Sequence, residues 1–303
     1  MTGIVTLIAD PRRQALEDTL VDAVARALTD AGFAPGLPTW LSPSEAVDLE
    51  LRGGDLKRAR AVAEAAITGD PIDVGVQAAG NRRKKLLIAD MDSTVIGQEC
   101  IDELAAAMGL RDQVSAITER AMRGEIEFEG ALRERAAMLA GLSAADMEAV
   151  LNTRITLNPG ARTLVATMRA HGAYTALVSG GFTFFTNRIR ERAGFDIDQA
   201  NELLTDGAGM LRGTVGEPIL GRAAKRDALE NLAASRGCAI ADTLAVGDGA
   251  NDLAMIEAAG LGVAFHAKPT VADQADVRIE YADLTALLFL QGYPRDAFIN
   301  PCE

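Results

Sequence analysis

The chain has 303 residues, of which 49% are hydrophobic and 24% charged, and its formal net charge is -13. This length suits two or three domains, and no apolar run reaches the roughly 18 residues of a membrane span, so we expect a soluble protein without a membrane segment. The acidic balance argues against a nucleic-acid partner, because a phosphate backbone requires a basic face. Three widely spaced cysteines and two histidines argue against a disulfide framework, a zinc site and a histidine-based triad. The N-terminus shows no basic patch followed by an apolar core, so the expected location is the cytoplasm.

The first 80 residues are predicted to alternate strands and helices. In the first predicted helix, apolar residues recur every four positions and form one stripe. The order strand, helix, strand, strand, helix, strand is typical of a ferredoxin-like domain, and it resembles small regulatory amino-acid-binding (ACT-like) domains. We interpret this part as a packing or dimerisation module, through which a homodimer is expected, with effector binding as the alternative. The predicted strands are 4–8, 38–41, 46–51 and 72–76, and the predicted helices are 13–31 and 56–67.

A polar and basic stretch, residues 80–85, follows this domain. Its run of cations has no interleaved aromatic residues, so a solvated linker is a better interpretation than a nucleic-acid site. The predicted domains are therefore 1–80, a linker at 81–85, and a core from 86 to 303.

The core is predicted to open with an apolar strand, 86–89, that ends in two carboxylates, Asp90 and Asp92. Fully apolar runs of this length are typical of buried parallel strands, and α/β sheets bind ligands beyond the carboxyl ends of such strands. Alternation along an extended backbone turns both carboxylates to the same side, where a bound cation would relieve their repulsion. Taken alone, the pair is also compatible with an ordinary turn.

Residues 101–157 are predicted to be helical, with glycines at the breaks. A helical insertion after the first core strand suggests a cap, at about 98–157, that closes over the site and excludes water. Strands and helices then alternate, which predicts a parallel sheet with right-handed crossovers. The later predicted strands are 174–178, 243–246 and 262–265, the later helices are 161–170, 184–193, 222–235, 252–259 and 281–290, and 200–215 is expected to form a hairpin around 206–209.

Three later stretches follow or adjoin apolar runs and supply parts of a phosphate site. Ser179 offers a hydroxyl and Gly180 an unobstructed backbone N–H, Lys225 offers a positive charge, and 247–252 carry two carboxylates and an amide among glycines. Each has an ordinary structural interpretation when taken alone. In this order after the paired carboxylates, they resemble the haloacid dehalogenase superfamily of phosphotransferases. The resemblance implies an α/β fold with a Rossmann-like parallel-sheet core and a helical cap inserted after the first core strand, here preceded by the ferredoxin-like (βαββαβ) α+β domain.

The chemistry of phosphate esters then gives each part a role. Asp90 fits a nucleophile that forms an aspartyl-phosphate, and Asp92 fits a general acid that protonates the departing alkoxide and then takes a proton from water. Mg²⁺ prefers one or two carboxylates with phosphate oxygen and waters, which suits Asp90, Asp248 and the main-chain carbonyl of Asp92. Asp252 is expected as a further ligand or as an outer-shell carboxylate. The phosphoryl oxygens are expected to bind Ser179, Gly180, Lys225 and, directly or through the lysine, Asn251.

Between about 86 and 268 the resemblance narrows to the phosphoserine phosphatase family. It is carried by Asp90-Met91-Asp92-Ser93-Thr94, Glu99-Cys100-Ile101-Asp102-Glu103, Thr118-Glu119-Arg120-Ala121-Met122-Arg123-Gly124, Val178-Ser179-Gly180-Gly181-Phe182-Thr183 and Gly247-Asp248-Gly249-Ala250-Asn251-Asp252. The resemblance implies that Glu99 pairs with the ammonium group of phosphoserine and that Arg135 binds its carboxylate, while Met122 and Phe128 form an apolar wall. Without it, the two charged residues would be interpreted as surface charges and the two apolar ones as cap core.

These observations together predict a Mg²⁺-dependent phosphoserine phosphatase that releases L-serine and phosphate, the last step of serine biosynthesis by that route. One alternative is a phosphatase or phosphotransferase of the same superfamily acting on another small phosphorylated metabolite. The other is a regulatory protein that senses an amino acid and has an idle core.

Overall fold

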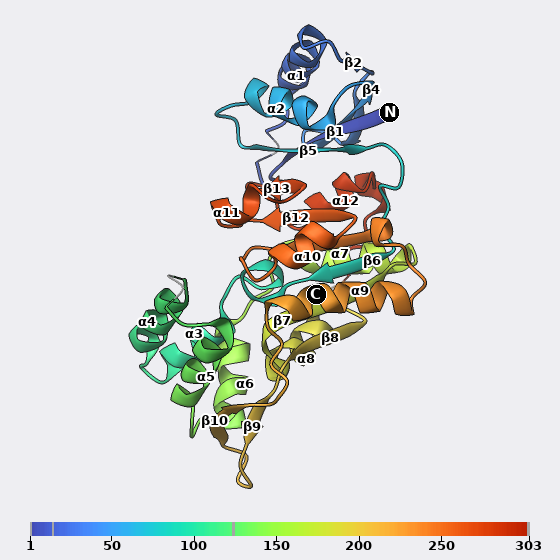
Figure 1. The fold of residues 1–303 in the computed structure, drawn as a ribbon. Coiled ribbons are helices and arrows are strands. Elements are labelled where there is room, and N and C mark those ends of the chain that lie inside the picture. Colours follow the sequence, from blue (N-terminus) through green and yellow to red (C-terminus); the bar gives the residue numbers. More distant parts are fainter. Residues whose placement is uncertain (1, 14, 123–124, 302–303) are drawn as a thin grey trace.

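The molecule is built from an N-terminal domain, a parallel-sheet core and a helical cap, which follow one another in space (Figure 1). The computed structural model describes residues 2–13, 15–122 and 125–301, with Met122 and Arg222 described in their backbone only. Across the described part of the chain, every helix is too short or too polar to cross a membrane.

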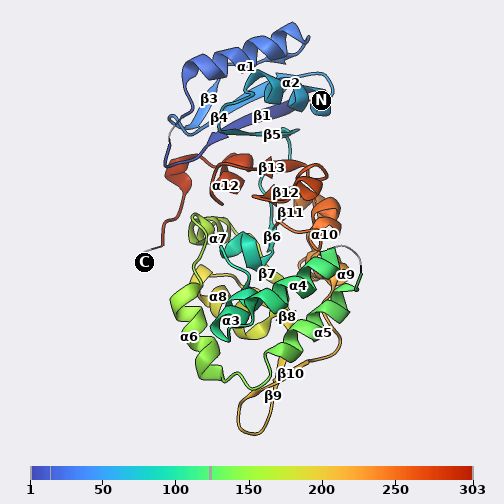
Figure 2. The same ribbon diagram turned by 90° about the vertical axis from the view of Figure 1, so that its left-hand side faces the viewer.

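The N-terminal domain is an antiparallel sheet with two helices on one face (Figure 2). Its elements are β1 (Thr2–Ala9), α1 (Asp18–Asp30), β2 (Ala34–Pro35), β3 (Thr39–Ser42), β4 (Ala46–Arg52), α2 (Leu56–Ala66) and β5 (Ile72–Ala78). The strands run in the order β2-β4-β1-β5, and β3 pairs with β4. Val24 and Leu28 of the predicted stripe are buried in the core of this domain, together with Val21, whereas Leu20 is only partly buried. Apart from the additional short β2, the order of elements confirms the ferredoxin-like prediction.

The helix predicted from residue 13 begins at Asp18 instead. Asp10 accounts for the difference, because its carboxylate accepts hydrogen bonds from the backbone and the guanidinium of Arg12, and its carbonyl accepts one from the N–H of Arg13. An aspartate that binds the backbone two residues later favours a turn over a helix.

The core is a parallel sheet whose strands run in the order β13-β12-β11-β6-β7-β8. The strands are β6 (Leu86–Ala89), β7 (Tyr174–Phe182), β8 (Ile197–Asn201), β11 (Thr243–Gly247), β12 (Leu261–Phe265) and β13 (Val277–Ile279). The flanking helices are α7 (Ala161–Ala170), α8 (Thr183–Ala193), α9 (Arg222–Ser235), α10 (Leu253–Ala258), α11 (Pro269–Ala272) and α12 (Ala286–Leu290). All four residues of β6 are fully buried, as expected of a central parallel strand. The α/β prediction is therefore confirmed.

The core strands β8 and β13 were not predicted, and the last helix, α12, is shorter than predicted. The edge strand β8 carries a polar sequence, Ile197–Asn201, that lacks the apolar run of a central strand. The helix expected at 281–290 begins only at Ala286, because the backbone N–H groups of residues 280–282 bind Asp73 of the N-terminal sheet. The partner of these N–H groups, Asp73, thus belongs to another domain.

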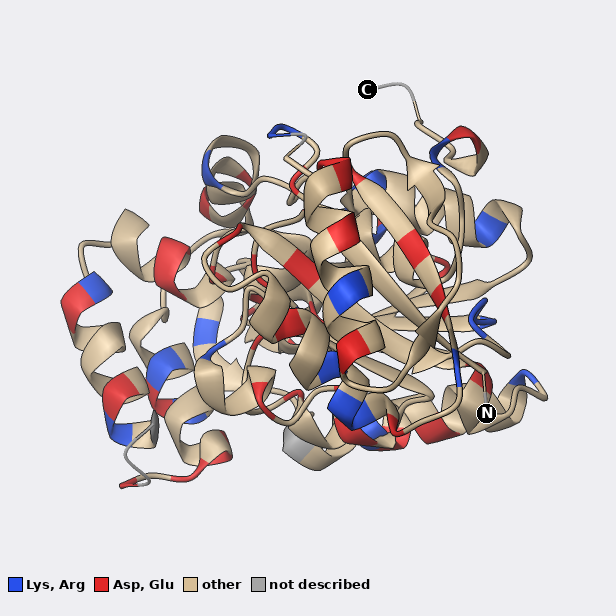
Figure 3. Cartoon of the chain, turned by 90° about the horizontal axis from the view of Figure 1, so that it is seen from above, with Lys and Arg blue, Asp and Glu red and all other residues tan. Residues whose placement is uncertain are grey.

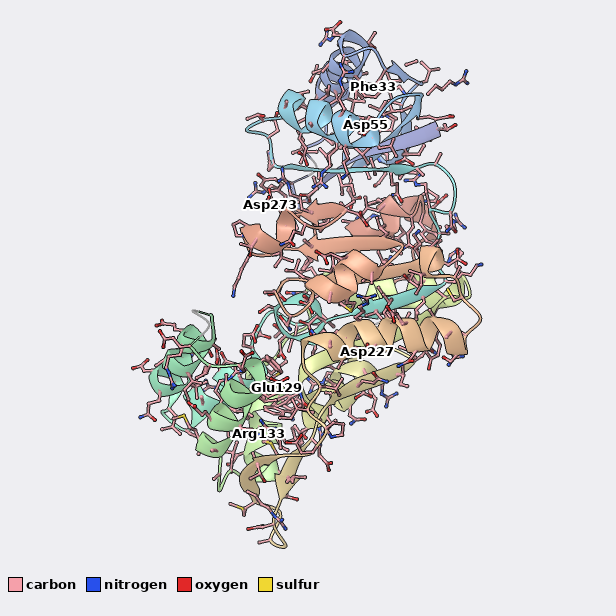
Figure 4. All side chains as sticks on the ribbon, viewed as in Figure 1. Phe33, Asp55, Glu129, Arg133, Asp227 and Asp273 are labelled. Carbon is pink, nitrogen blue, oxygen red and sulfur yellow. The ribbon has the colours of Figure 1, made fainter. Side chains whose placement is uncertain are left out.

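Four helices of the described residues, lying between β6 and α7, form the cap. They are α3 (Cys100–Ala107), α4 (Arg111–Met122), α5 (Phe128–Met138) and α6 (Ala144–Arg154). The predicted hairpin is present as β9 (Leu203–Thr205) and β10 (Leu211–Val215), and it extends from the core sheet to lie beside the cap. Arg133 of α5, which Figure 4 labels on the cap, forms an ion pair of 2.7 Å with Glu217, just after this hairpin. The hairpin therefore supports the outer side of the cap.

The stretch between the two sheets is not a solvated linker, and that prediction is wrong for Arg82 and Lys84. Arg82 donates hydrogen bonds to the carboxylate of Asp48 on β4 and to the carbonyl of Leu290 at the end of α12. Lys84 is buried and donates to the carbonyl of Ala241. Buried cations need such partners, and Arg82 finds them on both sides of the junction. Figure 3 views the molecule from above, with the N-terminal domain toward the viewer, and shows acidic and basic positions interspersed along the chain.

Candidate active site

A cavity of about 570 Å³ lies between the cap and the carboxyl ends of β6, β7 and β11. In α/β sheets this edge is where ligands bind. The predicted residues that line it are Asp90, Asp92, Glu99, Phe128, Arg135, Ser179, Gly180, Asp248 and Asn251. Segments far apart in the sequence are thus brought together at one edge of the sheet. The side chain of Met122 lies outside the described residues.

Lys225 connects two carboxylates beneath this cavity. Its Nζ lies 2.7 Å from Oδ1 of Asp90 and 2.5 Å from Oδ1 of Asp252. All three side chains are buried, with Lys225 only 2% exposed. Burial disfavours the charged lysine, but the attraction of Asp252 and Asp90 outweighs it and raises the pKa of Lys225. The lysine therefore remains a fixed positive charge beside Asp90.

Asp90, Asp248 and Asp252 form a cluster in which one carboxylate oxygen from each lies within 4.8 Å of the others. The pKa of Asp90 is raised well above its ordinary value, and the pKa of Asp248 is raised to about 7. In both cases burial is the largest cause and repulsion from Asp252 is the second. Such repulsion is relieved by a bound cation. An oxygen-only donor set fits a hard divalent ion such as Mg²⁺.

Within the cluster, Asp252 differs from the other two carboxylates. Its Oδ1 binds Lys225, and its Oδ2 accepts hydrogen bonds from the backbone N–H groups of Asp248 (3.2 Å) and Gly249 (3.0 Å). A side chain at Gly247 could not fit, because a Cβ there would lie 2.4 Å from Cγ of Asp252. Asp252 thus fixes the loop that carries Asp248, which favours the outer-shell role over direct ligation.

Asp92 turns its carboxylate toward a different set of partners. Its Oδ1 accepts a hydrogen bond from the N–H of Cys100 (2.9 Å), and its Oδ2 lies 3.4 Å from Oγ of Ser179. The pKa of Asp92 is raised to about 7, mainly by burial and secondly by the nearby charge of Glu99. A carboxyl group with a pKa near neutrality can both give and take a proton. The predicted metal contact of Asp92 concerned its main-chain carbonyl and stays a prediction.

The loop after Asp92 is held in an uncommon backbone conformation. Ser93 has a φ of 56°, in the left-handed region, and its Oγ donates a 2.7 Å hydrogen bond to Oε1 of Glu99. This bond directs Glu99 to the cavity.

An irregularity in β7 between Val178 and Phe182 presents Ser179 and its neighbours to the cavity. The Oγ of Ser179 accepts a hydrogen bond from the N–H of Gly181 (2.8 Å). A Cβ at Gly181 would lie 2.8 Å from Oδ2 of Asp92, so a side chain there would displace the carboxylate of Asp92. Phe128 reaches across from the cap, since a Cβ at Gly180 would lie 3.1 Å from its ring.

Arg135 enters the far side of the cavity from the cap helix α5. Its Nη1 donates to Oγ1 of Thr118 (3.4 Å) and its Nε to the carbonyl of Ala131 (3.3 Å). Burial lowers its pKa, while the charges of Asp102 and Glu99 counteract the shift. Among the described residues, no carboxylate pairs with this guanidinium within 4.0 Å. Arg135 is therefore placed to bind an anionic group in the cavity.

Several residues at the site were not predicted. Thr94 donates a hydrogen bond from Oγ1 to Oδ1 of Asp248 (3.0 Å), and Asp102, Thr118 and Lys268 line the cavity. Lys268 follows β12, so the rule that ligands bind at the carboxyl ends of strands could have identified it. Thr118 and Asp102 lie on cap helices, where spacing alone gives no such indication.

Comparisons with known proteins agree with this geometry. The model of the haloacid dehalogenase-like hydrolase family matches residues 87–257. A phosphoserine phosphatase from Streptomyces coelicolor is 39% identical over 301 residues, which cover 97% of this chain and 71% of that protein.

Two solved structures also resemble the chain. A haloacid dehalogenase family hydrolase from Salmonella enterica serovar Typhi gives a TM-score of 0.83 at 31% identity, covering 95% of this chain and 98% of the other. A phospho-aspartyl intermediate analogue of phosphoserine phosphatase gives a TM-score of 0.63 at 40% identity, covering 68% and 98%. The chain therefore belongs to the haloacid dehalogenase-like hydrolase family.

Proposed function

We propose that the protein is a phosphoserine phosphatase, which hydrolyses O-phospho-L-serine to L-serine and phosphate in the last step of serine biosynthesis. The observation that carries the proposal is that one cavity is lined both by Asp90 and Asp248, with Lys225 buried beneath them, and by Glu99 and Arg135. Phosphoserine has a phosphate at one end and an ammonium and a carboxylate at the other. The similarity to the Streptomyces coelicolor enzyme supports the same substrate.

In the first step, a carboxylate oxygen of Asp90 attacks phosphorus, and the bond between phosphorus and the seryl oxygen breaks. Asp92, with its pKa raised to about 7, gives its proton to the departing oxygen. This step leaves an aspartyl-phosphate at Asp90 and a free serine. The solved phospho-aspartyl analogue of a related enzyme supports this route.

In the second step, Asp92 as a carboxylate takes a proton from water, and the water oxygen attacks phosphorus. The bond between phosphorus and Asp90 breaks, which releases phosphate and restores the carboxylate. Lys225 and Ser179 stabilise the charge on the phosphoryl oxygens, Lys225 as a buried point charge and Ser179 as a hydroxyl donor. Asn251, which also lines the cavity, is assigned to the same oxygens.

The carboxylate cluster is proposed to hold Mg²⁺, with Asp90 and Asp248 as side-chain ligands, the main-chain carbonyl of Asp92 as a third, and Asp252 behind them. When bound, the ion supplies positive charge that neutralises the carboxylates and the phosphate. The protein's own part is to hold Asp90 and Asp248 close together through Lys225 and Thr94.

Substrate choice is assigned to the cap side of the cavity. Glu99 would pair with the ammonium group, and Arg135 would bind the carboxylate with its planar fork of donors. Phe128, and by resemblance Met122, would exclude water from the closed site.

A substrate panel tests this function. Phosphate release from phosphoserine, phosphothreonine and an aryl phosphate is measured with Mg²⁺ and with a chelator. We expect a strong preference for phosphoserine that the chelator abolishes. Chelator-sensitive activity without that preference would assign the chain to another phosphorylated metabolite, and no turnover with serine binding would favour the sensing alternative.

The remaining features of the proposal concern the whole molecule. We place the enzyme in the cytoplasm, and the free thiols of Cys100 and Cys238 support this location.

The functional units are taken as 1–80 and 86–303, joined by 81–85. We assign dimerisation to the N-terminal domain. Light scattering on the full chain, beside a variant with an exposed charge at Leu37 (89% exposed), tests the dimer.

A further inference from the structure

Asp73 is a buried carboxylate of the N-terminal sheet that binds the core. It is 3% exposed and lies on β5. Its Oδ1 accepts a hydrogen bond from the N–H of Glu280 (2.7 Å) and its Oδ2 from the N–H of Ala282 (2.9 Å), with the N–H of Tyr281 at 3.2 Å from Oδ2. Successive backbone N–H groups around one anion form a concave binding site. These bonds fix residues 280–282 to the N-terminal sheet.

A first hydrogen-bonded path leads from this segment to the catalytic cluster. His266 is in the left-handed region, with a φ of 46°, and is held there because its N–H donates to the carbonyl of Ile279 (2.8 Å) and its Nε2 lies 2.9 Å from the carbonyl of Ala282. Two residues later, the N–H of Lys268 lies 3.4 Å from the carbonyl of Asp248. The loop after β12 is thus hydrogen-bonded to residues 279–282 at one end and to Asp248 at the other.

A second path reaches the same aspartate from the other side. The N–H of Leu284 donates to the carbonyl of Pro159 (3.2 Å), in the segment where the chain returns from the cap. Next to it, Nδ2 of Asn158 donates to the carbonyl of Thr94 (2.8 Å). Thr94 in turn donates from Oγ1 to Oδ1 of Asp248 (3.0 Å). The first path therefore begins in the segment 280–282 that Asp73 holds, the second begins two residues after it at Leu284, and both end at Asp248.

We propose that Asp73 is a positioning residue for the active site: by holding residues 280–284, it fixes Asp248 through both hydrogen-bonded paths. The N-terminal domain is then part of the scaffold of the metal-binding cluster. This inference rests on the proposed function, because it takes Asp248 as a metal ligand.

Asp73→Asn tests the proposal, since it keeps the size of the side chain but replaces one acceptor oxygen by a group that donates. We expect the dissociation constant for Mg²⁺, measured calorimetrically without substrate, to rise roughly 2- to 30-fold, the range of couplings transmitted through packed networks. The KM for phosphoserine at saturating Mg²⁺ should not change, because Glu99 and Arg135 are untouched. An unchanged dissociation constant would overturn the proposal.

Glu45→Gln is the matched control. Glu45 forms a short ion pair with Arg295 that also joins the N-terminal domain to the core but does not contact residues 280–284. We expect this variant to lose stability and keep its Mg²⁺ affinity, and an equal loss of affinity would show that domain docking in general, not Asp73, is responsible.

His266→Phe is a second variant, which cuts the first path without altering Asp73. It should weaken Mg²⁺ binding less than Asp73→Asn, because the second path remains, and unaltered binding would refute the first path. Binding of Mg²⁺ by the wild type tests the proposed function, whereas the difference between wild type and variants tests the role of Asp73, so the two failures are distinguished.

Discussion

Replacing Lys225 by methionine removes the charge that lies between two buried carboxylates. The lysine Nζ is 2.7 Å from Asp90 and 2.5 Å from Asp252, and methionine occupies a comparable volume without the charge. Breaking a buried ion pair by removing one partner costs roughly 3–5 kcal/mol, because the other charge is left uncompensated. We expect a loss of that size in the free energy of unfolding at pH 8.

The loss should depend on pH in a defined direction. Burial already raises the pKa of Asp90, and without the attraction of Lys225 this pKa lies still further above its value in the unfolded chain. A carboxyl group whose pKa is raised on folding stabilises the fold at low pH and loses that contribution as the pH rises. The variant should therefore approach the wild type in stability as the pH is lowered from 8 to 5.

Urea unfolding, followed by circular dichroism at both pH values, measures these quantities. The double variant Lys225→Met/Asp252→Asn removes one of the two orphaned charges, so its loss should be smaller than the sum of the single losses by roughly 1–3 kcal/mol. Phosphatase activity should fall by roughly 10²- to 10³-fold in the single variant. A stability equal to the wild type at pH 8 would refute the view that Lys225 compensates these carboxylates.

Three further predictions follow from the same geometry. Asp90→Asn should abolish turnover while its circular dichroism spectrum stays that of the wild type, and substantial residual activity would remove the covalent route. Arg135→Ala should reduce kcat/KM for phosphoserine by roughly 10- to 100-fold, because a hydrogen bond between charged groups is lost. The same variant should keep its kcat/KM for an aryl phosphate, which has no carboxylate to bind. Equal losses on both substrates would contradict the assignment of Arg135 to the substrate carboxylate. Burial raises the pKa of Asp73 to about 6, above its value in the unfolded chain, so its contribution to stability is full below about pH 4 and is lost by about pH 6. Between pH 4 and pH 6, the free energy of unfolding of the wild type should fall by roughly 3 kcal/mol more than that of Asp73→Asn, as measured by urea unfolding. If the unfolding free energies of the two proteins change with pH in parallel, Asp73 does not make this contribution.

The site was predictable where chemistry and sheet topology coincide. Asp90, Ser179 and Asp248 each follow or end an apolar strand, so a parallel sheet must bring them to one edge. Lys225 lies on a helix and would be interpreted alone as a solvated residue, and only its place among the other parts gave it a role. Its burial between two carboxylates depends on how α9 packs, which local sequence does not encode.

The junction between the two sheets could not be predicted for a related reason. Arg82 and Asp73 are polar residues that each bind a segment of the core more than 200 residues away, Leu290 for Arg82 and residues 280–282 for Asp73. Composition indicated a solvated linker, but the polar face of the N-terminal sheet and the carbonyls of the last residues of α12 offered hydrogen bonds in place of water. The same long-range contacts shortened the last helix.

Catalysis through a covalent intermediate at Asp90 can be tested by trapping that intermediate. The enzyme is mixed with phosphoserine labelled in its phosphate, quenched in acid within milliseconds, and digested for mass analysis. We expect a hydroxylamine-sensitive label on the peptide that contains Asp90, absent in Asp90→Asn. Rapid turnover by the wild type without any such label would show that water attacks phosphorus directly and that Asp90 is not the nucleophile.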